Sequence, residues 1–160
     1  VVADNERDIL KIAMVERYTG EGKVGLGLVH GFGFKYGALA SSVAHDSHNI
    51  LVVGVNENDM SYAVSKIVET GGGMVFVTNG SVKALVKLPV AGILSDKPAE
   101  AVAEELHRLV EETKKAGSKL SEPHMTLSIL GLIVIPELRV FNKGLFDVMK
   151  NSVVNVFVEQ

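Results

Sequence analysis

The sequence contains no cysteine, no basic stripe and no long apolar run. Without cysteine, the chain cannot form disulfides, thiolate zinc sites or a cysteine nucleophile. The longest apolar run, residues 127–135, is too short for a membrane span, which takes about 20 residues. Because lysine and arginine form no cluster, nothing points to a nucleic-acid partner. We therefore predict neither a membrane protein nor a nucleic-acid-binding protein.

The chain is rich in apolar residues. Of its 160 residues 47% are hydrophobic, and the mean hydropathy is +0.26. This apolar content is enough for one domain with its own core. We expect some of the remaining apolar residues to form a surface that covers another domain or subunit. The chain starts at Val1 without methionine or a signal-peptide pattern, so we expect a piece of a longer protein. The lack of cysteine is consistent with the cytoplasm, where we expect this protein.

Two segments have the pattern of amphipathic helices. The first opens at Asn56, a good N-cap, and ends at the glycines that begin with Gly71. Its expected buried face consists of Met60, Ala63, Val64, Ile67 and Val68. The second starts near Pro98 and closes at Gly117, with acidic residues early and lysines late. Its shared face consists of Val102, Leu106, Leu109, Val110 and Thr113.

The remaining apolar segments predict short strands. They cover residues 9–18, 24–34, 49–55, 74–77, 81–88, 138–141 and 153–158. Asn79-Gly80 predicts a hairpin turn between two of them. Residues 126–135 could form either a helix or a strand, and a helical turn is expected over residues 145–149. Together these elements predict an α+β fold: mixed, largely antiparallel β-sheet layers with two main amphipathic helices packed on them.

The densest group of reactive side chains lies in residues 41–49. Its polar members are Ser41, Ser42, His45, Asp46, Ser47, His48 and Asn49. A polar turn, in which Asp and Asn bind local backbone N–H groups, accounts for such a group. His-x-x-His is a weak metal-binding spacing, and a Ser–His–Asp triad needs a convergence in space that sequence neighbours do not easily provide. Taken alone, these residues favour the turn.

The other candidate sites are weaker. Residues 20–25 match GxGxxG, but a β-like run follows where nucleotide binding needs a helix, so we expect a hairpin turn. His107 lies on the charged face of the second helix and is expected to be solvated. His124 lies in a loop without a functional pattern. His30, in a predicted strand, is a candidate to approach residues 41–49.

Several long and unusual stretches occur in order along nearly the whole chain. They are residues 30–50, which include the word ALASSVAHDSHNI, and residues 52–56, 69–73, 88–96, 125–128 and 134–139. Together they resemble the C-terminal domain of the adenine deaminases of the amidohydrolase superfamily. One departure lies at His124, where that family usually has phenylalanine.

The resemblance implies that residues 1–160 are a single C-terminal domain and that a metal-binding barrel domain lies upstream. In such enzymes the barrel holds a divalent metal, manganese or iron, and a metal-bound hydroxide converts adenine to hypoxanthine and ammonia. No metal is then expected in this fragment, which we expect to be inactive alone. The resemblance makes five residues candidates for active-site support or substrate contact: Ser42, His45, Asp46, His48 and Asn49.

Two other interpretations stand beside this one. The domain could be structural, capping the barrel or forming a homo-oligomer interface, with residues 41–49 as a hydrogen-bonded core element. It could also be an independent module that binds purine or metal. In the adenine deaminase interpretation, the partners are the upstream barrel and adenine.

Overall fold

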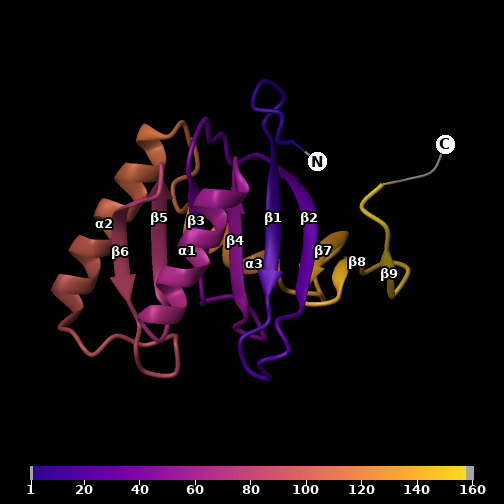
Figure 1. The fold of residues 1–160 in the computed structure, drawn as a ribbon. Coiled ribbons are helices and arrows are strands. Elements are labelled where there is room, and N and C mark those ends of the chain that lie inside the picture. The colour runs from indigo at the N-terminus through magenta and orange to yellow at the C-terminus, as the bar shows by residue number, and fades with distance from the viewer. Residues whose placement is uncertain (1, 158–160) are drawn as a thin grey trace.

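The computed structural model describes residues 2–157, which form a six-stranded sheet, a three-stranded sheet and three helices (Figure 1). The large sheet has the order β2-β1-β4-β3-β5-β6 and is antiparallel throughout. Its strands are β1 (Ile9–Val15), β2 (Val24–His30), β3 (Ala38–Ser41), β4 (Ile50–Gly54), β5 (Gly73–Thr78) and β6 (Ser81–Lys87). The small sheet consists of β7 (Leu138–Phe141), β8 (Gly144–Asp147) and β9 (Ser152–Val154). The helices are α1 (Glu57–Glu69), α2 (Ala99–Lys115) and α3 (Pro123–Ile129).

Helix α1 covers the middle of one face of the large sheet. The side chain of Asn56 caps it by accepting a hydrogen bond from the backbone N–H of Asp59 at 2.9 Å. The helix comes close because the strands beneath it carry small residues: a Cβ on Gly54 would lie 2.6 Å from the Met60 side chain. The core on this side consists of Ala13, Ala38, Ala40, Ile50, Val52, Met60, Ala63, Ile67, Val75 and Val77.

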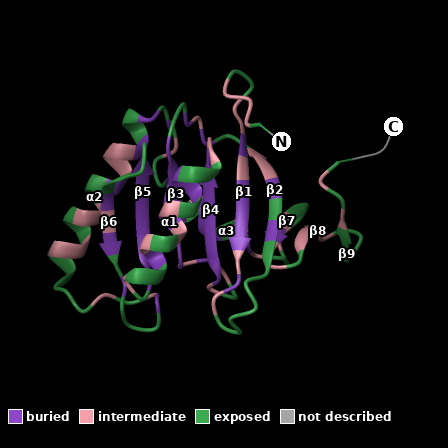
Figure 2. Cartoon of the chain, viewed as in Figure 1, coloured by how far each residue is buried: buried purple, intermediate pink, exposed green. Residues whose placement is uncertain are grey.

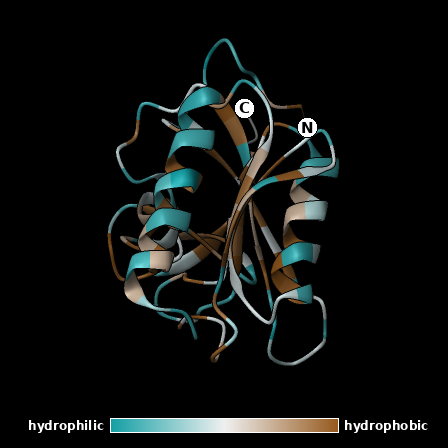
Figure 3. Cartoon of the chain, turned by 90° about the vertical axis from the view of Figure 1, so that its left-hand side faces the viewer, coloured by the Kyte–Doolittle hydropathy of each residue, from teal (hydrophilic) through white to brown (hydrophobic). Residues whose placement is uncertain are grey.

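Helices α2 and α3 and the small sheet cover the other face. Phe34 and Phe76 meet edge to face there, with ring centroids 5.5 Å apart, and Leu109 of α2 and Leu127 of α3 are fully buried among them. Figure 3 shows the large sheet nearly edge-on between helices that turn hydrophilic faces outward. Figure 2 shows buried residues gathered in the central strands and exposed ones along β2.

The predicted α+β class is confirmed, as are the two amphipathic helices and the hairpin at Asn79-Gly80. Residues 20–23 lie in the hairpin connection between β1 and β2, as expected, and Val24 and Gly25 begin β2. The buried carboxylate of Asp59 accepts a hydrogen bond from the Gly80 N–H at 2.8 Å, so the start of α1 holds the tip of the β5–β6 hairpin. Among residues 2–157, no helix has the length and apolar character that crossing a membrane requires.

Two local predictions are wrong, and the segment that could have been helix or strand begins as a helix. Val68 is 64% exposed, because it lies about 100° around the helix from Ile67, beyond the buried stripe. Residues 145–149 do not form a helical turn: β8 occupies most of this segment and pairs with both β7 and β9. Residues 126–135 begin inside α3, which ends at Ile129. The last predicted strand is shorter in the structure, where β9 ends at Val154; Val158 lies outside the described residues.

Candidate functional site

Residues 42–49 connect β3 to β4 at one edge of the large sheet. The end of β1 and the start of β5 lie at the same edge, because β1 and β5 are antiparallel to β4 and β3 respectively. The connection therefore meets two other loops, the one after β1 and the one after β6. Together they form a polar edge, which we define as Arg17, Ser42, His45, Asp46, His48, Asn49 and Gly92.

Ser42 is the buried anchor of the polar edge. Its Oγ donates a hydrogen bond to the Gly92 carbonyl oxygen at 2.5 Å and accepts one from the Gly73 N–H at 2.8 Å. Its backbone N–H bonds the Gly73 carbonyl oxygen at 2.9 Å. Close packing leaves no room for a side chain nearby, since a Cβ on Gly72 would lie 2.2 Å from the Cα of Gly92. Ser42 therefore joins β3, β5 and the loop after β6, and its hydroxyl is occupied by backbone.

Arg17 ties the three loops together. Its Nε donates to the His48 carbonyl oxygen at 2.6 Å, and a terminal guanidinium nitrogen donates to the Ala91 carbonyl oxygen at 2.8 Å. Its backbone N–H bonds Oδ1 of Asn49 at 3.2 Å. Tyr18 supports the same carbonyl of His48 through its hydroxyl at 3.2 Å. The backbone of the connection is thus held from outside, by a residue more than thirty positions away.

The two histidines of the connection touch. The centroids of their rings lie 5.3 Å apart, in an edge-to-face arrangement. Nδ1 of His48 accepts a hydrogen bond from the Ala44 N–H at 3.2 Å. Burial lowers the pKa of His48, as do neighbouring His45 and Arg17, and Asp46 opposes this only in part. A neutral ring with Nδ1 as acceptor carries its proton on Nε2.

His45 and Asp46 are the least constrained side chains of the polar edge. The backbone N–H of His45 is fixed to the carbonyl oxygen of Ser128 in α3 at 3.1 Å, so the main chain is anchored. The ring of His45 is half-buried and the carboxylate of Asp46 is exposed. Within residues 2–157, neither side chain has a hydrogen-bond partner. A rigid backbone therefore presents one imidazole and one carboxylate for an external contact.

Known proteins are similar to this chain over its whole length. A family model described as "Adenine deaminase C-terminal domain" matches residues 1–152. The chain belongs to this family. An adenine deaminase of Desulfatibacillum aliphaticivorans is 49% identical over 156 residues, covering 98% of this chain and 27% of the relative. An adenine deaminase of Methanothrix thermoacetophila is 50% identical over 159 residues, covering 99% and 28%.

A third relative, an adenine deaminase of Clostridium botulinum strain Langeland, is 46% identical over all 160 residues, again 27% of its own length. The chain thus spans just over a quarter of the length of the curated relatives it matches. The resemblance read from the sequence is confirmed at the level of this family. In each of these adenine deaminases, the matched region is one part of a much longer protein.

The donor set of this family member does not fit a metal centre. Within residues 2–157, no group of three or more His, Asp and Glu side chains lies close enough to hold an ion. His45, His48 and Asp46 adjoin one another, but Nδ1 of His48 is taken by the backbone N–H of Ala44.

The structure brings all five candidates to the polar edge but gives them different surroundings. Ser42 and Asn49 are buried and bonded to backbone, His48 is partly so, His45 is half-buried against His48, and Asp46 is exposed. The predicted polar turn is present, yet Asn49 serves the N–H of Arg17 instead of a local one. Sequence reasoning missed Arg17, because nothing in a lone arginine after a strand indicates a partner so far along the chain.

The other histidines lie away from the polar edge. His30 pairs with Ile9 at the far end of β1, so its candidacy to approach residues 41–49 is wrong. His107 is exposed on α2, as expected. His124 is 7% exposed and lies in α3 instead of a loop. Its Nδ1 is buried and has no hydrogen-bond partner among residues 2–157, and burial lowers the pKa of the ring.

Proposed function

We propose that residues 1–160 are a single domain of a cytoplasmic enzyme that hydrolyses adenine to hypoxanthine and ammonia, and that the polar edge supports its active site. The similarity to adenine deaminases supports the reaction. In it, water oxygen bonds to the purine carbon that bears the amine, and the C–N bond breaks. In this proposal the catalytic barrel and its divalent metal, manganese or iron, lie in the rest of the enzyme.

The role of the polar edge is supported by a difference between its residues. Ser42, Asn49 and the His48 backbone are fixed by hydrogen bonds, whereas His45 and Asp46 are presented without partners. A carboxylate is an acceptor for ring or amine N–H groups, and an imidazole both accepts and donates. Fixed placement of such groups is what positions a substrate or its surrounding water. We assign His45 and Asp46 to substrate contact or orientation, and Ser42, His48 and Asn49 to holding them.

The test compares variants in the longer enzyme that contains this chain. We expect His45→Ala and Asp46→Ala each to lower kcat/KM for adenine at least about tenfold, the scale of a lost polar contact worth roughly 1.4 kcal/mol. Melting temperature should change little, because neither side chain has a hydrogen-bond partner within residues 2–157. Normal turnover with normal stability in both variants would remove the proposal.

Matched controls come from the same chain. Asp96 is an exposed aspartate in the loop after β6, and His30 is an exposed histidine at the opposite end of the sheet. Asp96→Ala and His30→Ala should leave kcat/KM within about twofold of the unchanged enzyme, as expected for surface positions away from a site. Equal losses in the controls would mean that the assay reports a general effect on the domain.

A second candidate function is structural: the domain caps the barrel or forms an interface in a homo-oligomer. The inward hydrogen bonds of Ser42 and Arg17 favour it, because they stabilise the edge without offering groups to a ligand. In that case changes at His45 and Asp46 alter stability or assembly instead of kinetics. A well-folded Asp46→Ala enzyme of normal assembly with greatly reduced turnover excludes this candidate.

A further inference from the structure

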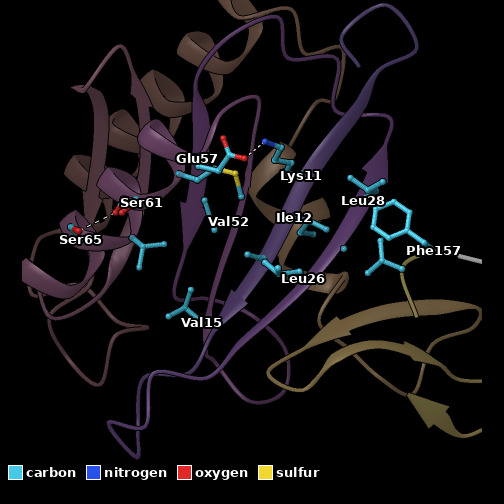
Figure 4. A pocket seen from close by; sticks show the side chains of 15 residues that line it. Lys11, Ile12, Val15, Leu26, Leu28, Val52, Glu57, Ser61, Ser65 and Phe157 are labelled. Carbon is cyan, nitrogen blue, oxygen red and sulfur yellow. Dashed lines mark hydrogen bonds and ion pairs between the residues drawn. The ribbon is translucent and has the colours of Figure 1, made fainter. Parts of the chain in front are cut away.

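An apolar trough lies on the α1 side of the large sheet, where the helix leaves β1 and β2 uncovered (Figure 4). It encloses a cavity of about 440 Å³ between α1 and the edge strand. Its apolar lining consists of Ile12, Ala13, Val15, Leu26, Leu28, Val52, Met60 and Val64, with Val156 and Phe157 at one end. The trough is on the opposite face of the sheet from the small sheet.

The sequence of β2 explains why apolar side chains point into the trough. Residues alternate between the two faces of a strand, and β2 alternates glycine with larger residues. The glycine side faces the small sheet, where a Cβ on Gly25 would lie 1.7 Å from the Phe141 carbonyl oxygen. The larger side chains must therefore point the other way: Leu26 is 59% and Val24 47% exposed. A contiguous apolar surface of this kind, unlike scattered single residues, indicates a binding surface.

The two charged side chains of the lining are paired with each other, and one of its two serine hydroxyls bonds the backbone of α1. Lys11 forms an ion pair with Glu57, and the Ser65 hydroxyl donates to the Ser61 carbonyl oxygen at 3.0 Å. A charged ligand would find no free counter-charge among these groups. An occupant with aliphatic or aromatic side chains would lose little, since it needs to break no hydrogen bond on entering.

We infer that the trough seats an apolar surface of the preceding part of the parent enzyme. This inference rests on the proposed function, in which the chain is one domain of a longer adenine deaminase. The relatives are nearly four times as long as the matched region, and the family is named as their C-terminal domain. Most of such a protein therefore precedes the matched region and is available to cover the trough.

The path of the chain places that preceding part beside the trough. Asp4 pairs with Ile9 at the start of β1 through two backbone hydrogen bonds of 2.8 Å, so the chain reaches the sheet on the strand that forms the trough floor. At its other end β1 carries Val15 in the trough, and Arg17 of the polar edge follows two residues later. A domain seated in the trough therefore reaches the end of β1 that leads to Arg17.

Cysteine labelling tests the inference, and this chain has no cysteine of its own to interfere. Leu26→Cys is compared in the 160-residue chain and in the longer enzyme, reading the mass of the peptide that contains residue 26 after exposure to a thiol reagent. We expect fast labelling in the 160-residue chain and labelling at least tenfold slower in the longer enzyme. Equal rates in both would overturn the inference.

Two controls define what protection means. Val82→Cys lies in β6, at the opposite edge of the sheet, and should label at the same rate in both proteins. Equal protection of residues 26 and 82 would overturn the assignment to the trough. Sedimentation could also show that the 160-residue chain forms a dimer in which Leu26→Cys labels slowly. That result would assign the trough to a second copy and overturn the inference.

Adenine turnover, measured on the same longer enzyme, separates this inference from the proposed function. If the longer enzyme turns over adenine but residue 26 is not protected from labelling, the docking is rejected and the proposed function stands. Protection without turnover supports the docking and rejects the function.

Discussion

The Nε of Arg17 donates a hydrogen bond to the carbonyl oxygen of His48 over 2.6 Å, joining the end of β1 to the connection between β3 and β4. A carbonyl held this way fixes the backbone on both sides of the loop tip. The same guanidinium reaches Ala91, so one side chain sets the relative positions of three loops. We regard Arg17 as the positioning residue of the polar edge, because it acts on His45 and Asp46 through the backbone.

Replacing Arg17 should therefore destabilise the domain. We expect Arg17→Met to lower the free energy of unfolding by about 2 kcal/mol, because three hydrogen bonds from a charged donor are lost while much of the stem is kept. Urea denaturation measures this. Arg108→Met, on the exposed face of α2, is the control and should stay within about 0.5 kcal/mol. An Arg17→Met domain as stable as the control would contradict this role.

The Ser42 hydroxyl offers a second test of the same edge. Ser42→Ala leaves the Gly73 N–H and the Gly92 carbonyl oxygen buried without that partner, and we expect a loss of about 2 kcal/mol in urea unfolding. Ser65→Ala, on the exposed side of α1, should change stability by less than about 0.5 kcal/mol. Similar values for the two variants would show that the buried hydroxyl is dispensable.

Much of the fold could be predicted because its signals are local. The Asn56 cap, the helical spacing up to Ile67 and the Asn79-Gly80 turn each depend on residues a few positions apart. Strand β8 was missed because its residues are all half-buried and its pairing depends on β7 and β9. The site followed the same division: residues 41–49 were found as a cluster, but Arg17 and Gly92 reach it only through the fold.

His124 should make the domain less stable in mild acid. Burial holds its pKa below the usual 6.5, so above pH 6.5 the ring is neutral in both states. As pH falls below that value, the unfolded chain takes up a proton that the folded chain resists, and the free energy of unfolding decreases. His48, whose pKa is also lowered, adds a change of the same sign.

His124→Phe should weaken this pH dependence and raise stability at pH 8 by about 1 kcal/mol, because it removes the unpartnered Nδ1. Thermal unfolding between pH 5 and pH 8 measures both effects. His107→Gln, on exposed α2, is the surface control and should change stability at pH 8 by less than about 0.5 kcal/mol. A His124→Phe profile that falls as steeply as that of the unchanged protein would contradict the assignment.

The glycine side of β2 should tolerate no side chain. Gly25→Ala places a Cβ against the Phe141 carbonyl oxygen, where backbone on both sides must shift, and we expect a cost of at least about 2 kcal/mol. Val24→Ala, one residue earlier with its side chain outward, should cost less than about 1 kcal/mol. Comparable unfolding free energies for the two variants would show that the small sheet does not constrain this strand.

The central claim, that the polar edge supports the active site, is tested most directly by measuring kcat/KM for adenine and melting temperature together on two variants of the longer enzyme. We predict that Asp46→Asn lowers kcat/KM at least about tenfold at an unchanged melting temperature, whereas Arg17→Met lowers both, since one residue contacts and the other positions. An Asp46→Asn enzyme with unchanged kcat/KM and unchanged melting temperature would contradict the claim.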